Sequence, residues 1–574
     1  MPDVPVDTLE TDVVVLGSGG AGLMCVLHAA HAAPELDIVL VSKGAVGRSG
    51  CTRMVQGGFN AVLDADDSLE LHYRDTLAGG NYLNDQELAW ALVHDAPGVI
   101  EELERDYGCL FDRTLDGALH QKAFAGQSRD RTVHRGDLTG IEIMSRLRDQ
   151  ILRLGVRELE DVRALDLVFD AGGELAGVTI LDAMSGRFAV VKARVVVVAT
   201  GGSATMYRVA APAREKTGDG LALCLRAGLE LRDMEMLQFH PTGLLAGDST
   251  LTGSVLEEGL RGAGARLYNV HGERFMTRYD PERLERSTRD VVARSSYLEI
   301  AEGRGTPAGG VLLDVSHLGA EEVERRFAGM VGRTRLIGRD LSREPIEVSP
   351  TAHFQMGGVI IDPECRTAID GLLVAGEDAG GAHGANRLGG NGVAESTVFG
   401  SRAGETAATL ARERPLRHPA AGEVEASVAR AIEPRKRTGA TADAMTQALK
   451  TAMWTGCGLV RSRRGLKNAA ATVDDLLERS QRVAAPGPEE WNLAWQQALD
   501  LRNQLEVART MIAAAAVREE SRGAHFREDF PMPDDDAWLQ YVVTQLDGDT
   551  IRTDTRPVEF TRLHPHAEPA RSLT

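Results

Sequence analysis

Cysteine is scarce in this sequence, and its spacing is wide. The six cysteines, at positions 25, 51, 109, 224, 365 and 457, never come closer than 26 residues along the chain. Zinc sites and iron–sulfur clusters usually require a Cys-x-x-Cys pair or a similarly close spacing. We therefore predict no metal site and no iron–sulfur cluster in this chain. Unpaired, reduced thiols are also typical of a cytoplasmic protein, which is the location we expect.

The sequence also lacks long apolar runs and has fewer basic than acidic residues, which argues against a membrane span and against a nucleic acid partner. No apolar run approaches the ~18–20 residues of a membrane-spanning helix, so we predict no direct span and expect any membrane association to come through partner subunits. Basic residues are outnumbered, because 64 Lys and Arg against 84 Asp and Glu give a formal net charge of −20. Such an acidic surface repels phosphate backbones, and no nucleic acid partner is expected.

Glycine, in contrast, is abundant. The chain has 62 glycines in 574 residues, about one in nine, against a usual ~7%. Glycine serves where the backbone takes a positive φ or must approach another group closely. The apolar and charged fractions, 43% and 26%, are those of an ordinary globular protein. This composition favours a nucleotide-binding enzyme, and the length suggests roughly three to four domains at ~150 residues each.

The first glycine turn follows a predicted strand. Residues 12–16, DVVVL, form a β-branched run typical of a buried parallel strand. Gly17, Gly19, Gly20 and Gly22 come next, and an apolar stretch with helical spacing follows them. In a dinucleotide-binding turn the glycines allow the turn, the approach of a pyrophosphate and close helix–strand packing. A tight turn in any other α/β protein is the alternative.

Two details of this nucleotide pattern stay open. The second predicted strand, 37–41, ends in Ser42 and Lys43 rather than in the acid that usually binds a ribose. Two later glycine turns, ATGG at 199–202 and TGDG at 217–220, end or follow predicted strands. Asp219 in the second of them is a candidate for a cofactor hydroxyl, and a simple Asp-Gly turn explains it equally well.

The middle of the chain carries His, Arg and Glu residues on glycine-rich segments. Arginine offers paired donors to carboxylates and histidine offers a directed donor, so this mixture is suited to a small polycarboxylate. For any one of these residues a structural role is the alternative. The set comprises His240, Thr242, Glu257, Glu258, Arg261, Arg289, His353 and Arg387.

At these residues the chain resembles the flavoprotein subunits of succinate dehydrogenases and fumarate reductases, which share a fold with L-aspartate oxidases. The resemblance runs from about residue 11 to about residue 410. It rests on several strings, among them CTRMVQGGFN at 51–60, DMEMLQFHPTGL at 233–244, PTAHFQMGG at 350–358 and GEDAGGAHGANRLGGN at 376–391.

The resemblance implies FAD as the cofactor and a hydride transfer at flavin N5. It implies that Arg289 donates the proton, with Glu258 and Arg261 as a relay, and that His240, Thr242, His353 and Arg387 meet a dicarboxylate. We also place Glu257 in this substrate site. The positions expected to hold FAD are Gly17, Gly19, Gly20, Gly22, Ser42, Lys43, Ser49, Thr52, Gln56, Gly57, Gly58, Gly201, Asp219, Glu377 and Asn391.

The sequence departs from the family pattern at two positions. Cys51 stands where many members have the histidine that links FAD covalently, so we expect non-covalent FAD; a cysteinyl link is the alternative. Glu257 stands where the family usually has a substrate-contacting Thr. A carboxylate there would repel a dicarboxylate unless it points away, is protonated or meets a cationic group on the substrate. We therefore expect Glu257 to govern which substrate is accepted.

We predict an α/β fold with a Rossmann-like FAD-binding domain at 1–239 and 344–412 and an inserted α+β capping domain at 240–343. A helical domain at 413–517 and a C-terminal tail region at 518–574 follow. The predicted function is interconversion of succinate and fumarate, or of a close dicarboxylate. The expected electron partner is an iron–sulfur subunit of a larger complex, with a soluble donor as the alternative. The alternatives are a stand-alone flavin oxidase or dehydrogenase acting on aspartate or another substituted succinate, and a non-catalytic electron-relaying flavoprotein.

Overall fold

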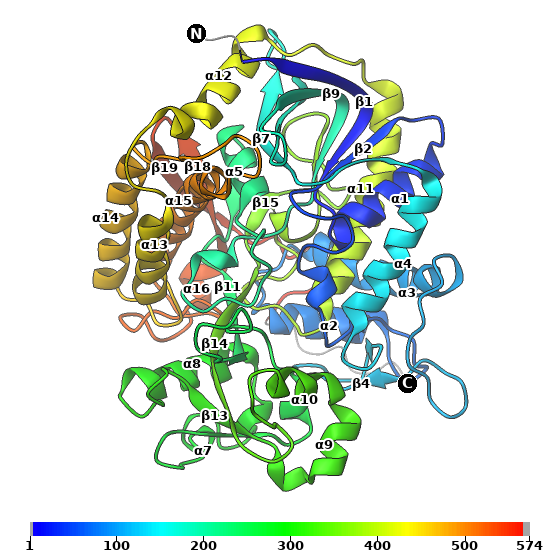
Figure 1. Cartoon of the computed structure of the whole chain (residues 1–574). Helices are drawn as coiled ribbons and strands as arrows, with labels where there is room; N and C mark the ends of the chain where they lie inside the picture. The colour runs from blue at the N-terminus through cyan, green and yellow to red at the C-terminus, as the bar shows by residue number, and fades with distance from the viewer. Residues whose placement is uncertain (1–3, 566–574) are drawn as a thin grey trace.

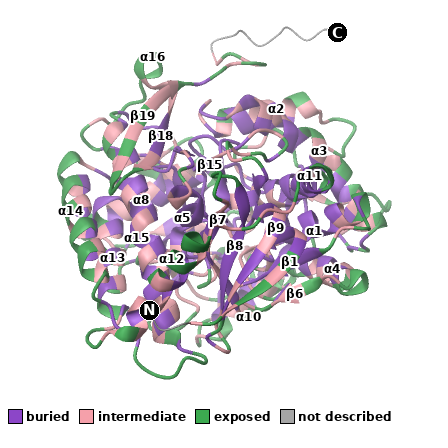
Figure 2. Ribbon diagram, turned by 90° about the horizontal axis from the view of Figure 1, so that it is seen from above, coloured by how far each residue is buried: buried purple, intermediate pink, exposed green. Residues whose placement is uncertain are grey.

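A seven-stranded sheet forms the centre of the protein, whose computed structural model describes residues 4–565 (Figures 1 and 2). The strands run in the order β6-β2-β1-β9-β8-β7, and β16 also pairs with β9. Strands β6, β2, β1, β9 and β16 are parallel, whereas β8 and β7 are antiparallel. Their bounds are β1 Val6–Leu16, β2 Ile38–Val41, β6 Arg157–Leu159, β7 Val162–Phe169, β8 Leu175–Asp182, β9 Phe188–Val198 and β16 Leu372–Val374.

The β-branched run predicted as a strand lies in the buried interior of this sheet. Val13, Val14 and Val15 of β1 are fully buried and lie between β2 and β9. Two helices, α1 (Gly20–Ala32) and α11 (Asn391–Glu413), pack side by side against the sheet. They approach closely because Gly400 and Gly404 of α11 face the backbone of α1, where a β-carbon would lie about 2.5 and 2.4 Å from carbonyl oxygens.

The predicted capping region forms a second layered unit with its own hydrophobic core (Figure 1, lower part). A four-stranded antiparallel sheet, in the order β11-β14-β13-β12, carries short helices around it. Strands β11 and β14 are paired and connect this unit to the rest of the chain. The predicted boundary between residues 239 and 240 lies within β11, and the one between residues 343 and 344 lies just before β14. The elements are β11 Leu237–Leu244, α6 Gly259–Gly262, β12 Arg266–Tyr268, α7 Met276–Tyr279, α8 Arg289–Ala301, β13 Val311–Asp314, α9 Ala320–Arg326, α10 Ala328–Arg335 and β14 Ile346–Gln355.

Helices dominate the segment after α11, as its periodicity predicts. The long helix α15 packs against α13 and α14, and it also contacts α5 of the first domain (Figure 1). The helices concerned are α5 Asp219–Arg226, α12 Ala421–Ile432, α13 Asp443–Gly456, α14 Arg463–Ser480 and α15 Leu493–Val517.

The region named above as a C-terminal tail is more ordered than that name suggests. Strands β18 and β19 pair with each other, and β18 pairs with β10, which extends a five-stranded sheet in the order β17-β15-β10-β18-β19. Val542, Val543 and Thr544 are consecutive buried residues of this sheet, and this short β-branched run is the strand signal in a segment rich in Asp and Pro. The elements are β10 Leu231–Arg232, β15 Gly358–Ile360, β17 Ala379–Gly380, α16 Asp535–Trp538, β18 Gln540–Asp547 and β19 Thr550–Pro557.

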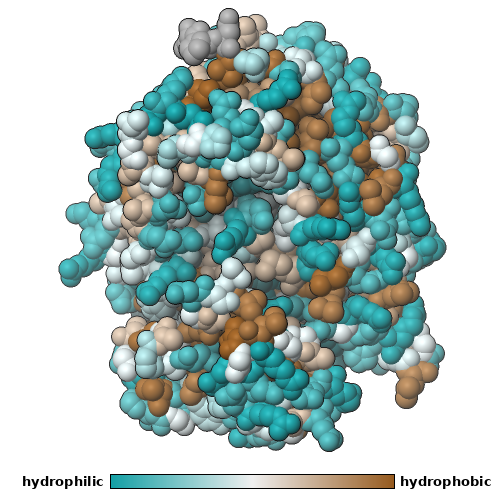
Figure 3. Space-filling view, in the orientation of Figure 1, coloured by the Kyte–Doolittle hydropathy of each residue, from teal (hydrophilic) through white to brown (hydrophobic). Residues whose placement is uncertain are grey.

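A small three-stranded sheet, in the order β3-β5-β4, belongs to the first domain, and Figure 1 shows β4 near the cap. Among residues 4–565 no helix is both long and apolar enough to cross a membrane. The face seen in Figure 3 is mostly hydrophilic, with apolar side chains in separate patches. The remaining elements are β3 Phe59–Asn60, α2 Leu69–Gly79, α3 Gln86–Arg105, β4 Gln121–Lys122, β5 Thr132–Val133 and α4 Thr139–Leu154.

Replacing Gly22 by Ala should disturb the turn between β1 and α1. A β-carbon there would lie 1.9 Å from the carbonyl oxygen of Gly17, so the helix must shift. Overpacking of this kind costs about 1–3 kcal/mol. We expect a lower unfolding temperature and a lower FAD content in the purified Gly22→Ala protein.

The matched control is Gly98→Ala in α3, where no other residue lies within 4 Å of the added β-carbon. This exposed helical position should gain about 0.5–1 kcal/mol, because alanine favours the helix. Equal FAD contents and unfolding temperatures for Gly22→Ala and the unaltered protein would contradict the packing argument.

Candidate active site

One cavity of about 660 Å³ lies where the carboxyl ends of β1, β2, β9 and β16 meet the cap. Ligands of open parallel sheets bind at this edge. The cavity brings together most of the residues that the sequence analysis predicted to bind substrate or cofactor. Those on its wall are Gly17, Gly19, Gly20, Ser42, Lys43, Ser49, Thr52, Gln56, Gly57, Gly58, Gly201, Asp219, His240, Glu257, Glu258, Arg289, His353, Glu377 and Arg387.

The start of α1 provides the pyrophosphate end of the cavity. Gly17 has a φ of +108°, and a β-carbon there would lie 2.1 Å from the carbonyl oxygen of Ala199. No side chain caps the helix at Gly19, and the amide of Gly20 donates to Thr52 Oγ1 at 3.0 Å. A glycine-lined helix N-terminus that opens into a cavity fits a dinucleotide phosphate.

The acid that is missing after β2 is supplied from elsewhere in the fold. Asp219, at the start of α5, accepts from Lys43 Nζ at 2.9 Å and lies 3.3 Å from Arg163 Nη2. Burial alone would raise the pKa of Asp219, but Lys43 and Arg163 outweigh it and hold that pKa well below its usual range. Two residues of α15 complete the cluster. Asp500 Oδ1 accepts from Lys43 Nζ at 2.6 Å, and Asn503 Nδ2 donates to Asp219 Oδ1 at 2.7 Å. The helical domain thus helps to orient a carboxylate at the expected ribose end.

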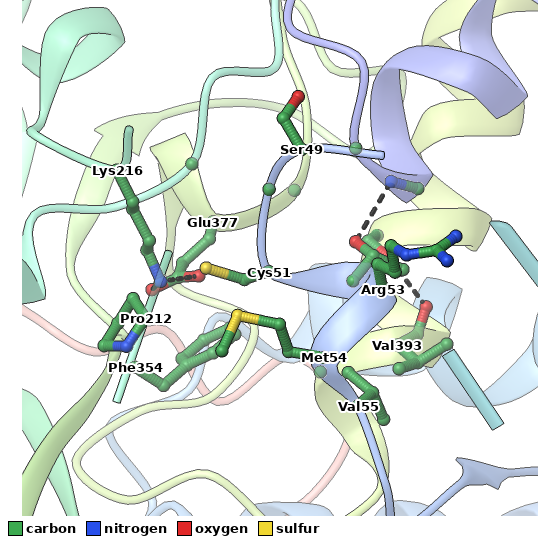
Figure 4. Close-up of a pocket in the computed structure, with 18 of the residues that line it drawn as sticks. Ser49, Cys51, Arg53, Met54, Val55, Pro212, Lys216, Phe354, Glu377 and Val393 are labelled. Carbon is green, nitrogen blue, oxygen red and sulfur yellow. Dashed lines mark hydrogen bonds and ion pairs between the residues drawn. The ribbon is translucent and has the colours of Figure 1, made fainter. Parts of the chain in front are cut away.

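Cys51 points into the cavity near a buried ion pair (Figure 4). Lys216 donates to both carboxylate oxygens of Glu377, and the amide of Gln355 donates to the same carboxylate at 2.8 Å. Burial raises the pKa of the Cys51 thiol, and the nearby Lys216 opposes that shift only in part. The thiol is therefore protonated at neutral pH and is a poor nucleophile.

Three arginines and one glutamate form the core of the opposite end. Glu258 accepts from Arg289 Nε at 2.8 Å and from Arg261 Nη2 at 2.9 Å. Burial alone would raise the pKa of Glu258, but Arg289 and Arg261 hold it below its usual value. Gln238 Oε1 accepts from Arg289 Nη1 and from Arg387 Nη2, both at 3.0 Å. One carboxylate and one amide thus align three buried guanidinium groups.

Arg387 keeps one donor available. Its guanidinium lies 4.4 Å from the centre of the Phe354 ring, and its Nε has no hydrogen-bond partner among the described residues. Burial and the charge of Arg289 lower the pKa of Arg387 to about 9, so the group is still cationic at pH 7. An unpaired buried donor is costly unless a ligand satisfies it.

His240 and His353 face each other across the cavity wall, with ring centres 5.5 Å apart. Burial and the charge of Arg289 hold the pKa of His240 well below its usual value. Burial and Arg387 do the same to the pKa of His353. Both rings are therefore neutral at physiological pH, and each can donate one hydrogen bond without adding charge.

Glu257 has a cationic partner within the protein. Its Oε1 accepts from Lys122 Nζ at 2.5 Å, and the carboxylate is almost completely buried. Burial raises the pKa of Glu257, while Lys122 opposes that rise. None of the three situations considered above included this one, in which the cation beside Glu257 is a lysine of the protein itself.

Four nominated residues lie behind the wall rather than on it. Gly22 packs against Gly17, as its predicted role in helix–strand contact requires. Thr242, expected at the substrate, instead approaches His240 Nδ1 at 3.1 Å and donates to the carbonyl of Leu256 at 2.7 Å. Arg261 reaches the cavity only through Glu258.

Asn391, expected to hold FAD, is fully buried and bonded to Asn60, His72 and Thr76. It sits at the first turn of α11, where these partners take up its side chain. The structure thus places it in the support of the cavity and not on its surface.

Sequence reasoning missed several charged residues of the site. Lys122, Arg163 and Lys216 form the ion pairs described above, and Gln238 joins two arginines. Lys122 lies two residues before FAGQ at 124–127, another string similar to the family, and Lys216 lies just before TGDG, but a single Lys carries no spacing signal. Gln238 lies inside the string DMEMLQFHPTGL, two residues before His240, and an amide carries no charge by which to single it out.

Comparisons with known proteins agree with this geometry. Residues 12–393 match the family described as "FAD binding domain", and residues 446–571 match "Fumarate reductase flavoprotein C-term". The chain is 42% identical to a fumarate reductase (CoM/CoB) subunit of Methanothermobacter marburgensis, over 91% of this chain and 95% of that one. It is 34% identical to the fumarate reductase flavoprotein subunit of Escherichia coli, over 97% and 95% of the two chains.

The fold has close counterparts among solved structures. A chain of Escherichia coli quinol fumarate reductase superposes with a TM-score of 0.92 at 34% identity, covering 98% of this chain and 99% of that chain. These matches confirm FAD as the cofactor, the predicted fold class and the resemblance stated above.

The neutral histidines lead to a pH prediction. Because the pKa values of His240 and His353 lie well below 6.5, neither ring gains charge as the pH falls from 8 to 6. The affinity of the FAD-loaded protein for a small dicarboxylate, followed by flavin absorbance, should change less than about threefold over this range. His240→Gln and His353→Gln should leave the shape of this profile unchanged. A tenfold rise in affinity through pH 6.5, lost in either variant, would show that the histidine concerned becomes charged.

Proposed function

The chain belongs to the family of fumarate reductase and succinate dehydrogenase flavoproteins, and on that basis we propose that it interconverts succinate and fumarate or a close dicarboxylate. The observation that carries the proposal is the charge of the substrate end. Arg289, Arg261 and Arg387 are three buried cations, and Glu258 provides the only carboxylate among residues 4–565 that hydrogen-bonds to any of them. This excess of positive charge suits a dicarboxylate dianion.

The chain's own residues would bind and polarise that dianion. Arg387, with its unpaired Nε, and the neutral donors His240 and His353 line the same wall. Donors aimed at a carboxylate stabilise negative charge that develops on the adjacent carbon atoms in the transition state. Bound FAD supplies the two-electron chemistry, while the protein supplies orientation and the electric field.

Arg289 is proposed as the proton donor of fumarate reduction and the proton acceptor of succinate oxidation. A guanidinium is a weak acid, with a pKa above ~12 in its usual state. It can act only if the proton it gives is replaced at once. The Glu258 carboxylate bonds to Arg289 and to Arg261, so a proton can pass along this chain of contacts.

Residues from both domains surround these groups and would exclude water from the reaction. Glu257, Glu258 and Arg289 come from the capping region, whereas Gly57 and Phe124 come from the FAD-binding domain. Exclusion of water strengthens each charge interaction inside the cavity. The proposed domain division, with a cap between two FAD-binding segments, assigns this role to residues 240–343.

An iron–sulfur protein is the proposed electron partner. The relatives named above are called subunits, and this sequence lacks the cysteine spacing for a cluster of its own. A partner that carries electrons would also provide any connection to a membrane. A stand-alone oxidase acting on aspartate remains an outcome of the test below, and Lys122 argues against it because Glu257 already has its cation.

The test is turnover by the purified FAD-loaded protein. With reduced viologen as electron donor we expect fumarate to be reduced, and Arg289→Gln should lower the rate by at least the ~10²–10⁴-fold of lost acid–base catalysis. FAD content should be unchanged, because Arg289 lies at the end of the cavity away from the glycine turn. Rates follow from viologen reoxidation, with aspartate and other substituted succinates run in parallel.

Arg343→Gln is the matched control for Arg289→Gln, since Arg343 is largely exposed on the cap and away from the cavity wall. An Arg289→Gln protein that keeps more than a tenth of the rate would remove this residue from the proton-transfer role. Peroxide formation from aspartate and O₂, without fumarate reduction, would replace the proposed function by the oxidase alternative.

Non-covalent attachment of FAD is a further part of the proposal. Cys51 replaces the linking histidine of many family members, and burial keeps its thiol protonated. Acid or heat precipitation should therefore release all of the flavin into the supernatant. Flavin fluorescence that stays with the protein band on denaturing electrophoresis, and is lost in Cys51→Ser, would demonstrate a cysteinyl link instead.

A further inference from the structure

The ion pair between Lys122 and Glu257 joins two parts of the chain beside the cavity. Lys122 ends β4 in the small sheet of the FAD-binding domain, and Glu257 comes just before α6 of the cap. The distance between Nζ and Oε1 is 2.5 Å, and the two side chains are 19% and 3% exposed. Water therefore screens this pair little, and each charge depends strongly on the other.

The pair lies beside the reactive end of the cavity. Lys122 Nζ is 5.9 Å from the centre of the Phe124 ring, which lines the cavity. Phe124 in turn adjoins the proposed proton donor: a β-carbon at Gly389 would lie 2.9 Å from Phe124 and 3.2 Å from Arg289 Nη2. Glu257 itself is on the wall. Its charge thus acts on whatever binds next to Arg289.

Other charged groups near the pair do not replace Lys122. Asp137 is a second buried carboxylate on this wall, and its charge opposes ionisation of Glu257. Arg333 of α10 also lines the cavity, but its Nη1 donates to the carbonyl of Val255 at 2.8 Å. Lys122 is the only cation that forms an ion pair with Glu257 in residues 4–565.

We infer that Lys122 is a specificity-determining residue, which neutralises Glu257 so that the cavity accepts a dicarboxylate dianion and disfavours an analogue carrying an amino group. This inference rests on the dicarboxylate site of the proposed function. With the pair intact, Glu257 does not reduce the excess of positive charge that the arginines leave over Glu258. An ammonium group on the ligand would have to displace Lys122 from Glu257.

Lys122 acts through Glu257, so the test must separate a charge effect from loss of structure. Two probes of the same skeleton serve this purpose: malonate, a dianion at pH 7.5, and aminomalonate, which adds one positive charge. Neither has the two-carbon backbone on which succinate and fumarate are interconverted. Their dissociation constants for the oxidised, FAD-loaded protein can be measured from flavin absorbance.

The unaltered protein should bind malonate at least tenfold more tightly than aminomalonate. Lys122→Met keeps the aliphatic length but leaves Glu257 unpaired, and it should reduce this ratio at least tenfold. Adding Glu257→Gln to Lys122→Met should bring the ratio back to within about threefold of its original value. A general loss of structure would weaken both ligands and would not be rescued.

Lys192→Met is the matched control, because Lys192 is also 19% exposed and pairs with Glu10 outside the cavity. It should leave the ratio unchanged. If Lys122→Met does not yield folded, FAD-loaded protein, Glu257→Gln alone provides the test. That variant adds one positive charge to the site and should raise the ratio at least threefold.

The inference is overturned by an unchanged ratio in folded Lys122→Met, by a double variant that behaves like the single one, or by undetectable malonate binding to the unaltered protein. A fall or no change of the ratio in Glu257→Gln would overturn it as well. Because the readout is binding, the expected shifts in ratio would support the inference even if viologen-linked fumarate reduction, the test of the proposed function, failed.

Discussion

The buried carboxylate of Glu258 is the interaction on which the reactive end of this protein depends. Three guanidinium groups come within one small volume, where their mutual repulsion and the loss of water would be prohibitive without a counter-charge. Glu258 bonds directly to Arg289 and Arg261, and Gln238 connects Arg289 to Arg387. The positive charge that Glu258 does not neutralise is available for an anionic ligand. Glu258 therefore both makes the buried arginines tolerable and leaves them able to bind an anion.

The charged groups of the reactive end come from two different domains. Glu258, Arg261 and Arg289 belong to the cap, whereas Arg387 comes from the loop before α11 in the FAD-binding domain. The paired strands β11 and β14 carry the chain into the cap and back. An active site divided in this way is complete only when the two domains are together, and closure of such a cap would couple water exclusion to the assembly of the charged groups.

Ion pairs between domains recur around the cavity. Lys122 and Glu257 join the small sheet to the cap, and Lys43 joins the end of β2 to Asp219 of α5 and Asp500 of α15. Each pair is at least partly buried, so removing one partner would leave an uncompensated charge. The helical domain therefore contributes to the nucleotide end, although none of its residues was nominated from the sequence. The two strands β18 and β19, in the region predicted as a tail, likewise complete a sheet that begins with β17.

The sequence by itself determined the fold class, the FAD cofactor and the family, because these depend on local patterns. A β-branched strand followed by Gly17, Gly19 and Gly22 is such a pattern, and the long strings around His240 and Arg387 are others. Only the tertiary structure decided which charges meet. Lys122 and Glu257 are 135 residues apart in the chain, and Lys216 and Glu377 are 161 residues apart. No spacing rule predicts such contacts, because they are set by how the sheet, the cap and α15 pack and not by the period of any helix or strand. For the same reason Thr242 and Asn391, correctly placed in their motifs, turned out to support the cavity from behind its wall.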